Sequence, residues 1–481
     1  MNNDIIKLLN FNPDEIEITD IEIVERTKII HIKKKLVPTY CPLCNTRMNS
    51  KGITHRNVNH PVLQDGYKLI LELSERRWYC QNTACNYHYT DDFTFALPKQ
   101  RQTNITPLLI LNELKDLNLP LTYLSKKYNV SDTYIHSIVM RYLDPKRLPM
   151  PRILSVDEVF LDFDGSNKYA LVLMDFESGQ IIDKLESRLK TTYDDYFLSI
   201  PLSERNNVEF VVCDMYNPYI NFTVNYFHKA KAITDSFHVH QWLNREISAY
   251  IREVKTRYLK RDQRKLEEKN IQTNRINDSI KQSRDVFILN HYQWILLKNK
   301  CNINYDLNGH WNRHLQMFLN TYDYEKMFLA LDDKFSEIRR LKELYVDFNH
   351  DFPKSKEKAT LDLTELICTY RSTSIPLFHN FADLLEKHID TITNSFIATT
   401  TYIGDEEIEE RYRRLSNGPM EGYNRKPKDL KRNSRGVTNF EYTRTRLLWS
   451  NRPYEPILAT PKPENKVHNY TNIKRGTYKK K

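Results

Sequence analysis

The chain has 481 residues, enough for about three domains with buried cores. Its Lys and Arg residues outnumber its Asp and Glu residues by ten, and this positive excess favours an acidic partner such as nucleic acid. No run of about 18 apolar residues predicts a membrane span, the amino terminus lacks the apolar core of a signal peptide, and no glycine-rich loop is suited to cradle phosphates. A membrane protein, a secreted protein and an NTPase are therefore disfavoured, and we expect a protein of the reducing cytoplasm.

Residues 1–98 are predicted to form an N-terminal β region with a zinc ribbon. Four cysteines fall in two pairs around strand-like segments over Tyr67–Leu73 and Arg76–Tyr79. The pairs are Cys41 with Cys44, and Cys80 with Cys85. Two Cys pairs on turns between strands suit tetrahedral coordination of one structural Zn²⁺. The second pair is wider than the common spacing, so His88 is an alternative to Cys85, and a disulfide framework is the alternative for all four.

Residues 99–148 are predicted to form a helix-turn-helix DNA-binding module. Leu121–Tyr128 and Ser131–Arg141 have the pattern of short amphipathic helices joined at Asn129 and Val130, with Ser131 as the N-cap of the second. In this motif the early residues of the second helix enter the major groove. The expected base contacts are Thr133, Tyr134 and His136, and the expected phosphate contacts are Lys126, Lys127 and Arg141. A helix pair with only a packing role is the alternative.

Residues 149–247 are predicted to begin a catalytic core. The elements expected are strands over Ile153–Leu161, Lys168–Asp175, Gln180–Leu185 and Val208–Cys213, a helix over Asn217–His228, a strand over Lys231–Thr234, and a helix from Asp235 through Trp242. The first alternates as a half-buried strand does, and the next two form a hairpin. This order is that of an RNase H-like α/β domain, which has an acid on its first strand, another just after its fourth and a third on a late helix. Asp157, Asp214 and Glu421 occupy those places.

Residues 248–400 are predicted to be an α-helical insertion that interrupts this core. The segment is polar, has helical patterning and is dense in charge between Arg252 and Lys281. Trp242, Trp294 and Trp311 are expected to lie in hydrophobic cores. The fold class is therefore multidomain α+β: a zinc ribbon, a helix-turn-helix and an RNase H-like domain with a long helical insertion.

Residues 401–452 are predicted to complete the catalytic core with a short helix that carries Glu421. Asn417 is a good N-cap and Pro419 suits a first helical turn. Glu421 would then lie near the positive end of the helix, which Pro427 is expected to end or kink. An exposed capped helix on a basic face is the alternative.

Two basic segments follow this helix. Eight Lys or Arg residues between Arg425 and Arg446 face only two acids, a pattern expected where a polyphosphate backbone lies beside a metal-binding carboxylate. Among them, Lys428, Lys431 and Arg432 are the expected phosphate contacts. The tail, residues 453–481, has the composition of a mobile arm that seeks nucleic acid, and a solvated tail without function is the alternative.

Three carboxylates have a chemical reason to gather in such a core. Cleavage of a phosphodiester uses two divalent cations about 4 Å apart, one activating the incoming oxygen and one stabilising the leaving oxygen. Mg²⁺ prefers oxygen ligands and keeps several waters, so a few carboxylates suffice. Asp157, Asp214 and Glu421 are thus predicted to hold two Mg²⁺ or Mn²⁺ ions, although a lone Asp on a strand is usually a solvated edge residue.

Four blocks of sequence also carry a resemblance to a known family. They are Asp157-Glu-Val, Cys213-Asp-Met-Tyr-Asn-Pro-Tyr219, Thr234-Asp-Ser-Phe-His-Val239 and Ser416-Asn-Gly-Pro-Met-Glu-Gly-Tyr-Asn424, the last followed by Lys428-Asp-Leu-Lys-Arg432. These blocks resemble the DDE transposases of bacterial insertion sequences, specifically the ISL-three family. The resemblance implies that Asp157, Asp214 and Glu421 are the metal-binding triad. Asp235 and His238 match another block, but Asp235 is equally well explained as an N-cap, and His238 as a core histidine or one that supports a metal ligand.

The resemblance implies a DNA transposase that binds the ends of its own element, cleaves them with a water nucleophile and joins the 3′-hydroxyls to target DNA. Its expected partners are double-stranded DNA and a second copy of the chain in a synaptic complex, and its expected location is the bacterial nucleoid. In related transposases the helical insertion contacts DNA or partner subunits, whereas a rigid lid is the alternative. A DNA-binding regulator with an inactive RNase H-like domain, and an RNase or repair nuclease on the same fold, are the alternative functions.

Overall fold

The computed structural model divides the chain into two units. The first contains Met1–Arg147, Phe160–Lys168 and Arg425–Lys481, and the second contains Leu148–Val159 and Tyr169–Asn424. The structure describes residues 2–61, 66–161, 168–215, 217–268, 283–397, 400–401, 411–412, 414–433 and 439–463.

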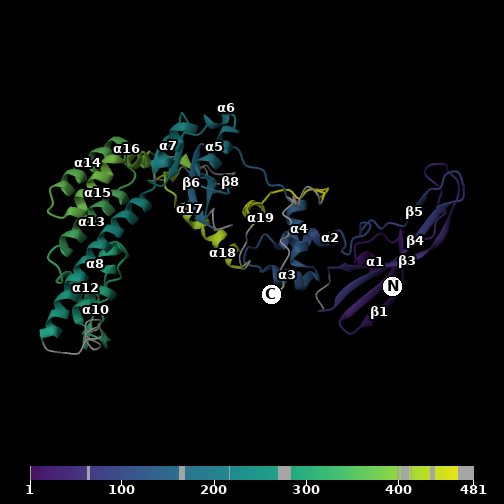
Figure 1. The fold of residues 1–481 in the computed structure, drawn as a ribbon, viewed down its shortest axis with the longest axis horizontal. Helices are drawn as coiled ribbons and strands as arrows, with labels where there is room; N and C mark the ends of the chain where they lie inside the picture. The colour runs from purple at the N-terminus through teal and green to yellow at the C-terminus, as the bar shows by residue number, and fades with distance from the viewer. Residues whose placement is uncertain are drawn as a thin grey trace, which may run out of the picture. The chain divides into compact units, whose positions relative to one another are not determined.

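A five-stranded sheet forms the β part of the first unit (Figure 1). Its strands lie in the order β1-β2-β4-β3, and β5 pairs with the end of β4. Their bounds are β1 Ile16–Val24, β2 Thr27–Lys34, β3 Met48–His60, β4 Lys68–Cys80 and β5 His88–Thr90, preceded by α1 Asn2–Leu8. The strands predicted over 67–73 and 76–79 are one continuous strand, because Ser74 and Glu75 between them pair with His55 and Thr54 of β3.

Four helices share a second core in the first unit. They are α2 Ile105–Glu113, α3 Leu121–Tyr128, α4 Asp132–Tyr142 and α19 Phe440–Asn451, and the unit also contains α18 Arg425–Asn433. The two short helices predicted from the pattern are confirmed. The Ser131 side chain accepts a hydrogen bond from the amide of Tyr134, as expected of an N-cap, and Asn129 turns the chain with a φ of +51°. Trp449 fastens α19 to α2 by donating from Nε1 to the carbonyl of Leu111.

The chain after α19 remains attached to the first unit as far as it is described. The amide of Lys462 donates to the carbonyl of Arg141, and Lys462 Nζ lies 2.8 Å from Asp144 Oδ1. Lys462 is therefore fixed rather than part of a mobile arm. The remaining cations of the predicted arm lie outside the described residues.

A second five-stranded sheet forms the α/β part of the second unit. Its order is β10-β9-β6-β7-β8, with β6 parallel to β9, β9 parallel to β10, and β7 antiparallel to β8. The bounds are β6 Ile153–Phe160, β7 Tyr169–Asp175, β8 Ile181–Leu185, β9 Phe210–Cys213 and β10 Lys231–Thr234, with helices α5 Lys190–Leu198, α6 Leu202–Arg205 and α7 Asn217–Tyr226. The predicted strand order, the hairpin and the helix before β10 are confirmed.

The first strand of this sheet is more buried than its sequence suggested. The alternation predicted a half-buried strand, but cores lie on both faces of β6: Leu154 and Val156 belong to one, and Ile153 to the other. The second core contains residues from β9, β10 and the distant segment around Leu415. The alternating sequence of β6 therefore does not correspond to one buried face and one solvent-exposed face.

A helical bundle forms the rest of the second unit (Figure 1). Its elements are α8 Ser236–Glu268, α10 Arg284–His291, α11 Trp294–Leu297, α12 Thr321–Leu329, α13 Phe335–His350, α14 Lys356–Arg371, α15 Pro376–Lys387 and α16 Ile389–Thr393, with η1 Lys300–Asn302 and η2 Asn394–Phe396. They share one large hydrophobic core. Short hairpins pair β11 His310–Asn312 with β12 Met317–Leu319, and β13 Thr400–Thr401 with β14 Arg411–Tyr412. Trp242 and Trp294 pack against the bundle core as predicted, but Trp311 on β11 is 52% exposed.

Candidate active site and candidate metal centre

The four paired cysteines of the first unit converge on one point. The Sγ atoms of Cys41, Cys44, Cys80 and Cys85 all lie within 4.8 Å of one another, and none forms a disulfide. Cys41 Sγ lies 3.6 Å from Cys85 Sγ, and Cys44 Sγ lies 3.4 Å from Cys80 Sγ. A tetrahedron with Zn–S bonds of about 2.3 Å would place neighbouring sulfurs about 3.8 Å apart. The cluster is therefore compatible with a four-cysteine zinc site.

Two similar turns bring these thiols together. Asn45 follows the second cysteine of the first pair with a φ of +54°, and Asn86 follows that of the second pair with a φ of +48°. Asn is among the few residues other than Gly that tolerate this left-handed conformation. The wider second pair thus ends in the same backbone reversal as the first. His88 hydrogen-bonds to the side chain of Asn86 and is not in the cluster, so the geometry favours Cys85 over His88 as the fourth ligand.

The thiols differ in their ease of ionisation. Hydrogen bonds with Thr46 lower the pKa of Cys44 to about 6, whereas desolvation raises the pKa of Cys80 and raises the pKa of Cys85 to about 12. A cation at the centre would favour the thiolate at each position, because zinc ligation requires deprotonated sulfur. Metal binding at this cluster is thus expected to release protons.

The candidate acids of the second unit lie at one edge of the sheet. Ser155 of β6 is in register with Val212 of β9, so we expect Asp157, two residues further along β6, and Asp214, directly after β9, to lie at the same level. Cys213 is in register with Thr234, so Asp214 and Asp235 are likewise level. The carboxyl ends of parallel strands meet at one edge, where open α/β sheets bind ligands. Three aspartates therefore follow that edge in a row.

Burial and charge perturb the first acid of this row. Desolvation raises the pKa of Asp157 to about 6, helped by the negative charges of Asp214 and Asp235 and opposed by the amide of Glu158 and by His238. Asp214 is more open, and its Oδ1 lies 3.4 Å from His238 Nδ1. A nearby cation would relieve the repulsion among these carboxylates and stabilise their charged forms. A perturbed carboxylate of this kind is common at functional sites.

Asp235 contacts the start of α8 and also interacts with His238 and with the backbone of Asn417. It immediately precedes α8, where its Oδ1 accepts from the amide of Phe237 at 3.4 Å. Burial raises the pKa of this carboxyl group, while His238 and the backbone amide of Asn417 lower it. Asp235 thus links the start of α8 to the segment that leads into the Glu421 helix.

Glu421 lies on α17 Gly418–Tyr423, whose two ends are tied to β6. Asn417 Nδ2 donates to the carbonyl of Val156 at 3.1 Å, and Asn424 Nδ2 donates to Asp157 Oδ2 at 2.7 Å. Met420 and Tyr423 are buried, whereas Glu421 is exposed. The Glu421 carboxylate therefore points away from the core. The side-chain amides of Asn417 and Asn424 hold α17 against β6, the strand that carries Asp157.

Two details of this helix differ from the sequence prediction. Asn417 is the N-cap residue and Pro419 lies in the first turn, as expected, but the Asn417 side chain makes no cap hydrogen bond, and its Nδ2 donates instead to the carbonyl of Val156. The helix ends at Tyr423 rather than near Pro427, and Pro427 lies in the first turn of α18, where a proline is well tolerated.

A buried lysine lies beneath the Glu421 helix. Lys184 of β8 is fully buried, its Nζ lies 5.4 Å from the centre of the Tyr423 ring, and within the described ranges Nζ has no hydrogen-bond partner. Desolvation lowers the pKa of Lys184 to about 7. The aromatic face offers the ammonium a cation–π contact in place of water.

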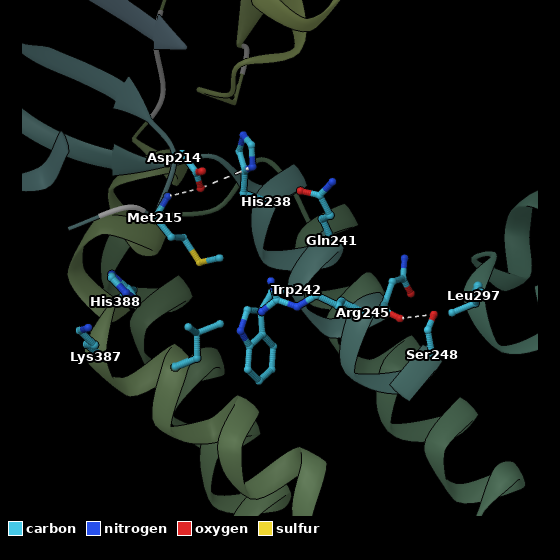
Figure 2. Close-up of a pocket in the computed structure, with 12 residues that line it drawn as sticks. Asp214, Met215, His238, Gln241, Trp242, Arg245, Ser248, Leu297, Lys387 and His388 are labelled. Atoms are coloured by element: carbon cyan, nitrogen blue, oxygen red, sulfur yellow. Dashed lines mark hydrogen bonds and ion pairs between the residues drawn. The ribbon is translucent and has the colours of Figure 1, made fainter. Parts of the chain in front are cut away.

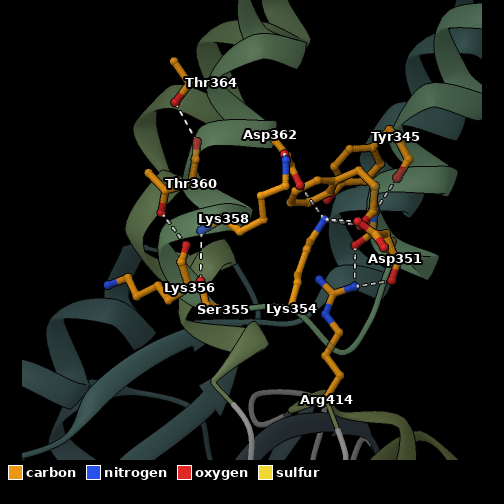
Figure 3. Close-up of polar contacts among 12 residues, drawn as sticks. Tyr345, Asp351, Lys354, Ser355, Lys356, Lys358, Thr360, Asp362, Thr364 and Arg414 are labelled. Carbon is orange, nitrogen blue, oxygen red and sulfur yellow. Dashed lines mark hydrogen bonds and ion pairs between the residues drawn. The ribbon is translucent and has the colours of Figure 1, made fainter.

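Arg414 anchors the segment that enters α17 (Figure 3). Its Nη1 donates to the carbonyl and side-chain oxygens of Asn349 at the end of α13, and its Nε donates to Ser395 Oγ at 3.1 Å. The guanidinium carbon lies 4.0 Å from the centre of the Phe396 ring. Burial lowers the pKa of Arg414 to about 10, which leaves it charged at neutral pH. The helical bundle thus holds the start of the Glu421 segment.

A pocket of about 900 Å³ opens beside Asp214 (Figure 2). Its walls come from the chain after β9, from α8, from the end of α11 and from the region where α15 meets α16. The lining includes His238 and His388, and the negative charge of Asp214 acts on His388 as well. The candidate acid edge is therefore accessible from a concave surface.

The three triad candidates do not form a tight cluster. Within the described ranges, Asp157, Asp214 and Glu421 do not have ligand atoms that all lie within 4.8 Å of one another. Asp20, Glu22 and His31 do meet this criterion, but they lie on the exposed part of the β1–β2 ribbon.

The predicted base contacts of the first unit differ in accessibility. Thr133 is exposed at the start of α4. Tyr134 packs against the helical core, and burial raises its pKa to about 12. The His136 ring lies 3.9 Å from that of Tyr442 of α19, and burial together with Arg446 lowers its pKa. Thr133 thus has the most open side chain of the three.

The predicted phosphate contacts are also unequal. Lys126 is exposed, Lys127 Nζ lies 2.7 Å from Glu113 Oε1, and Arg141 donates from Nε to the carbonyl of Lys462. On α18, Lys428 is exposed and Arg432 pairs with Asp429 at 3.3 Å. Lys431 donates to the carbonyl of Leu161 and its Nζ lies 5.7 Å from the centre of the Phe160 ring. Lys126 and Lys428 are therefore the most open of these cations.

Several residues were not predicted from the sequence to position the acids, although Asn417 was predicted as an N-cap. Asn417 and Asn424 carried a usable signal: they lie seven positions apart around Glu421, a spacing that places two side chains on the same face of a helix. Arg414 and Lys184 carried none, because a single cation in an otherwise ordinary segment does not reveal its burial.

The class of protein follows from comparison with known families. A family model described as a transposase, of the ISL-three (ISL3) DDE type, matches residues 154–447, more than half of the chain and a span that includes all three candidate acids. The chain belongs to the ISL-three family of DDE transposases, as the sequence blocks indicated. No curated protein matches it. Among the described helices, none is long and apolar enough to cross a membrane.

Proposed function

We propose that this transposase cleaves the DNA ends of its own element and joins them to target DNA at the edge of the β10-β9-β6-β7-β8 sheet. The observation that carries this proposal is the row formed by Asp157 and Asp214, together with the hydrogen bond from Asn424 that ties the Glu421 helix to Asp157. These acids come from segments far apart in the chain. Their approach at a solvent-accessible edge supports a catalytic role.

The strand arrangement supports an RNase H-like catalytic domain. β6, β7 and β8 follow one another across the sheet, and β9 and β10 continue it on the other side of β6 in the parallel direction. This arrangement brings the end of the fourth strand beside the first, as the proposed pair of Asp157 and Asp214 requires. The helices after β10 separate this sheet from the Glu421 segment in the sequence.

The donors suit hard divalent ions such as Mg²⁺ or Mn²⁺, since all three are carboxylates. Two bound ions supply an activated attacking oxygen and a stabilised leaving oxygen. Ions about 4 Å apart with bonds of about 2 Å can be reached by ligand oxygens up to about 8 Å from one another. A spread wider than 4.8 Å is therefore compatible with a two-ion site.

The remaining residues of the edge have positioning roles in this proposal. Asn424 orients the Asp157 carboxylate, and His238 restrains Asp214 from the first turn of α8. Asp235 fixes the approach to α17 through the amide of Asn417. Positioning of this kind matters because phosphoryl transfer depends mainly on alignment and charge stabilisation.

DNA recognition is assigned to the first unit. The four-cysteine cluster would hold one structural Zn²⁺, and α3 with α4 would form the helix-turn-helix, with Thr133 as the most accessible base contact. Lys126 and Lys428 would contact phosphates. Synapsis of two ends would join two copies of the chain. The predicted boundaries of the zinc ribbon, the helix-turn-helix and the helical insertion belong to the same proposal, whereas α18 and α19 of the predicted segment 401–452 belong to the first unit.

The test is DNA cleavage by full-length protein in Mg²⁺ or Mn²⁺, using a plasmid that carries the element's ends. Asp157→Asn, Asp214→Asn and Glu421→Gln should each abolish nicking and strand transfer while end binding persists. Asp195→Asn, which changes an exposed acid of α5, is the matched control and should cleave normally. Wild-type protein that binds the ends but cleaves nothing would favour a DNA-binding regulator, and a triad variant with full activity would remove that residue from the site.

A further inference from the structure

The pocket beside Asp214 has an aromatic and apolar floor. Trp242 of α8 is held in place by Phe381 of α15, with ring centres 5.7 Å apart and an angle of 15° between the rings. Figure 2 shows Met215 reaching from the Asp214 end of the pocket toward Trp242. Leu297 and Leu384 complete the apolar lining. A rigid indole of this kind offers a flat surface for another ring.

The rim of the same pocket is polar and carries two cations. Gln241 and Asn244 contribute amide groups, and Arg245 and Lys387 contribute cations. Asp214 is the single acid among the described residues that line the pocket. The cations can attract a phosphate at the entrance, while the amides can donate and accept hydrogen bonds along the edge of a planar ligand.

We propose that this pocket binds the base of one unpaired nucleotide next to the phosphate that is processed at Asp214. The inference rests on the proposed function, which places a DNA strand at Asp214, and it adds a substrate feature: a nucleotide taken out of the duplex. Aromatic side chains stack on the face of an extruded or single-stranded base, and polar groups contact its edge.

Other occupants fit the lining less well. An inorganic phosphate or sugar–phosphate backbone would use the cations but not the Trp242 floor. A paired base cannot use this pocket, because its faces are stacked and its pairing edge is occupied within the duplex. The volume of about 900 Å³ lies at the upper end of the range of about 300–1,000 Å³ typical of small-molecule sites.

The test compares two single strands that carry the same phosphates. One is a labelled 12-nucleotide DNA strand, and the other is an abasic strand of equal length. Binding to full-length protein is measured by fluorescence anisotropy without divalent metal, so that no cleavage occurs. Stacking of one base should strengthen binding of the base-containing strand by about 5- to 150-fold.

Trp242→Ala should abolish most of this preference and leave affinity for the abasic strand unchanged. Trp311→Ala is the matched control, because Trp311 is an exposed tryptophan of the same unit that does not line the pocket. Retention of the full preference by Trp242→Ala, or an equal loss in both tryptophan variants, would overturn the proposal. If Trp242→Ala fails to fold by circular dichroism, the double variant Gln241→Ala with Asn244→Ala decides: a reduced preference supports the pocket, and an unchanged one rejects it.

The failure of this proposal is distinguishable from failure of the proposed function. Asp157→Asn should lose cleavage but keep the preference for bases. If the triad variants lose cleavage while Trp242→Ala keeps its preference for bases, only the pocket assignment is wrong. If the triad variants cleave DNA normally while Trp242→Ala loses its preference, the catalytic assignment is wrong and the pocket still binds a base.

Discussion

The side chain of Asn424 is expected to control the orientation of Asp157. Its hydrogen bond to Asp157 Oδ2 is 2.7 Å long, and Asn424 is only 7% exposed. A hydrogen bond to a charged group contributes about 1.5–3 kcal/mol, which corresponds to about 10- to 150-fold in rate if the orientation is needed in the transition state. Asn424→Ala should therefore slow single-turnover nicking at saturating Mg²⁺ by about that factor.

An isosteric change should have a larger effect. Asn424→Asp replaces the donor with a second carboxylate at hydrogen-bond distance from Asp157, whose pKa burial has already raised to about 6. A like charge at that distance disfavours the ionised form further. We therefore expect Asn424→Asp to be slower than Asn424→Ala, with the largest difference between the two at low pH.

Asn417→Ala is the matched control for this pair of variants. Asn417 is 2% exposed and holds the other end of α17, but it donates to the backbone carbonyl of Val156 rather than to a carboxylate. It should lower thermal stability as much as Asn424→Ala and slow nicking less. Equal loss of nicking in the two alanine variants would show that Asn424 acts only by holding the helix, and an Asn424→Ala rate within twofold of wild type would refute the orientation argument.

Three further changes test other parts of the molecule. Elemental analysis should find one zinc per chain. The double variant Cys41→Ser with Cys44→Ser should lose this zinc, and the control variant Cys301→Ser should keep it. Freshly purified wild-type protein without zinc would contradict this prediction. Burial lowers the pKa of Lys184 from 10.5 to about 7, so between these pH values the unfolded chain binds a proton that the folded chain does not. Lys184→Met removes this cost of burial and should stabilise the second unit by up to about 5 kcal/mol below pH 7. The gain should shrink as the pH rises toward 10.5. A gain in denaturation midpoint that does not vary with pH would reject that reasoning. Lys428→Ala should lower the slope of log affinity against log salt concentration by about one, for end duplexes and random duplexes alike. A loss of affinity for the end duplex alone would show that Lys428 reads sequence.

Local signals in the sequence determined many of the elements. The turn before Gln180 follows from Gly179, which has a φ of +69° that few other residues adopt readily, and the start of α4 follows from the Ser131 cap. The spacing of the cysteines around strand-like segments likewise indicated a four-thiol cluster. These features depend on a few neighbouring residues, so their physical causes are visible in a single segment.

The tertiary structure decided which distant residues meet. Asn424 bonds to Asp157 across 267 positions, and the level of Asp214 with Asp157 depends on the register of two parallel strands. His136 was likewise predicted to contact bases, but its ring packs against Tyr442 of α19. The periodicity of the sequence shows which face of a helix or strand is apolar. It does not show which other element will pack against the residues beside that face. Long-range packing therefore decided both the geometry of the candidate active site and the accessibility of the predicted DNA contacts.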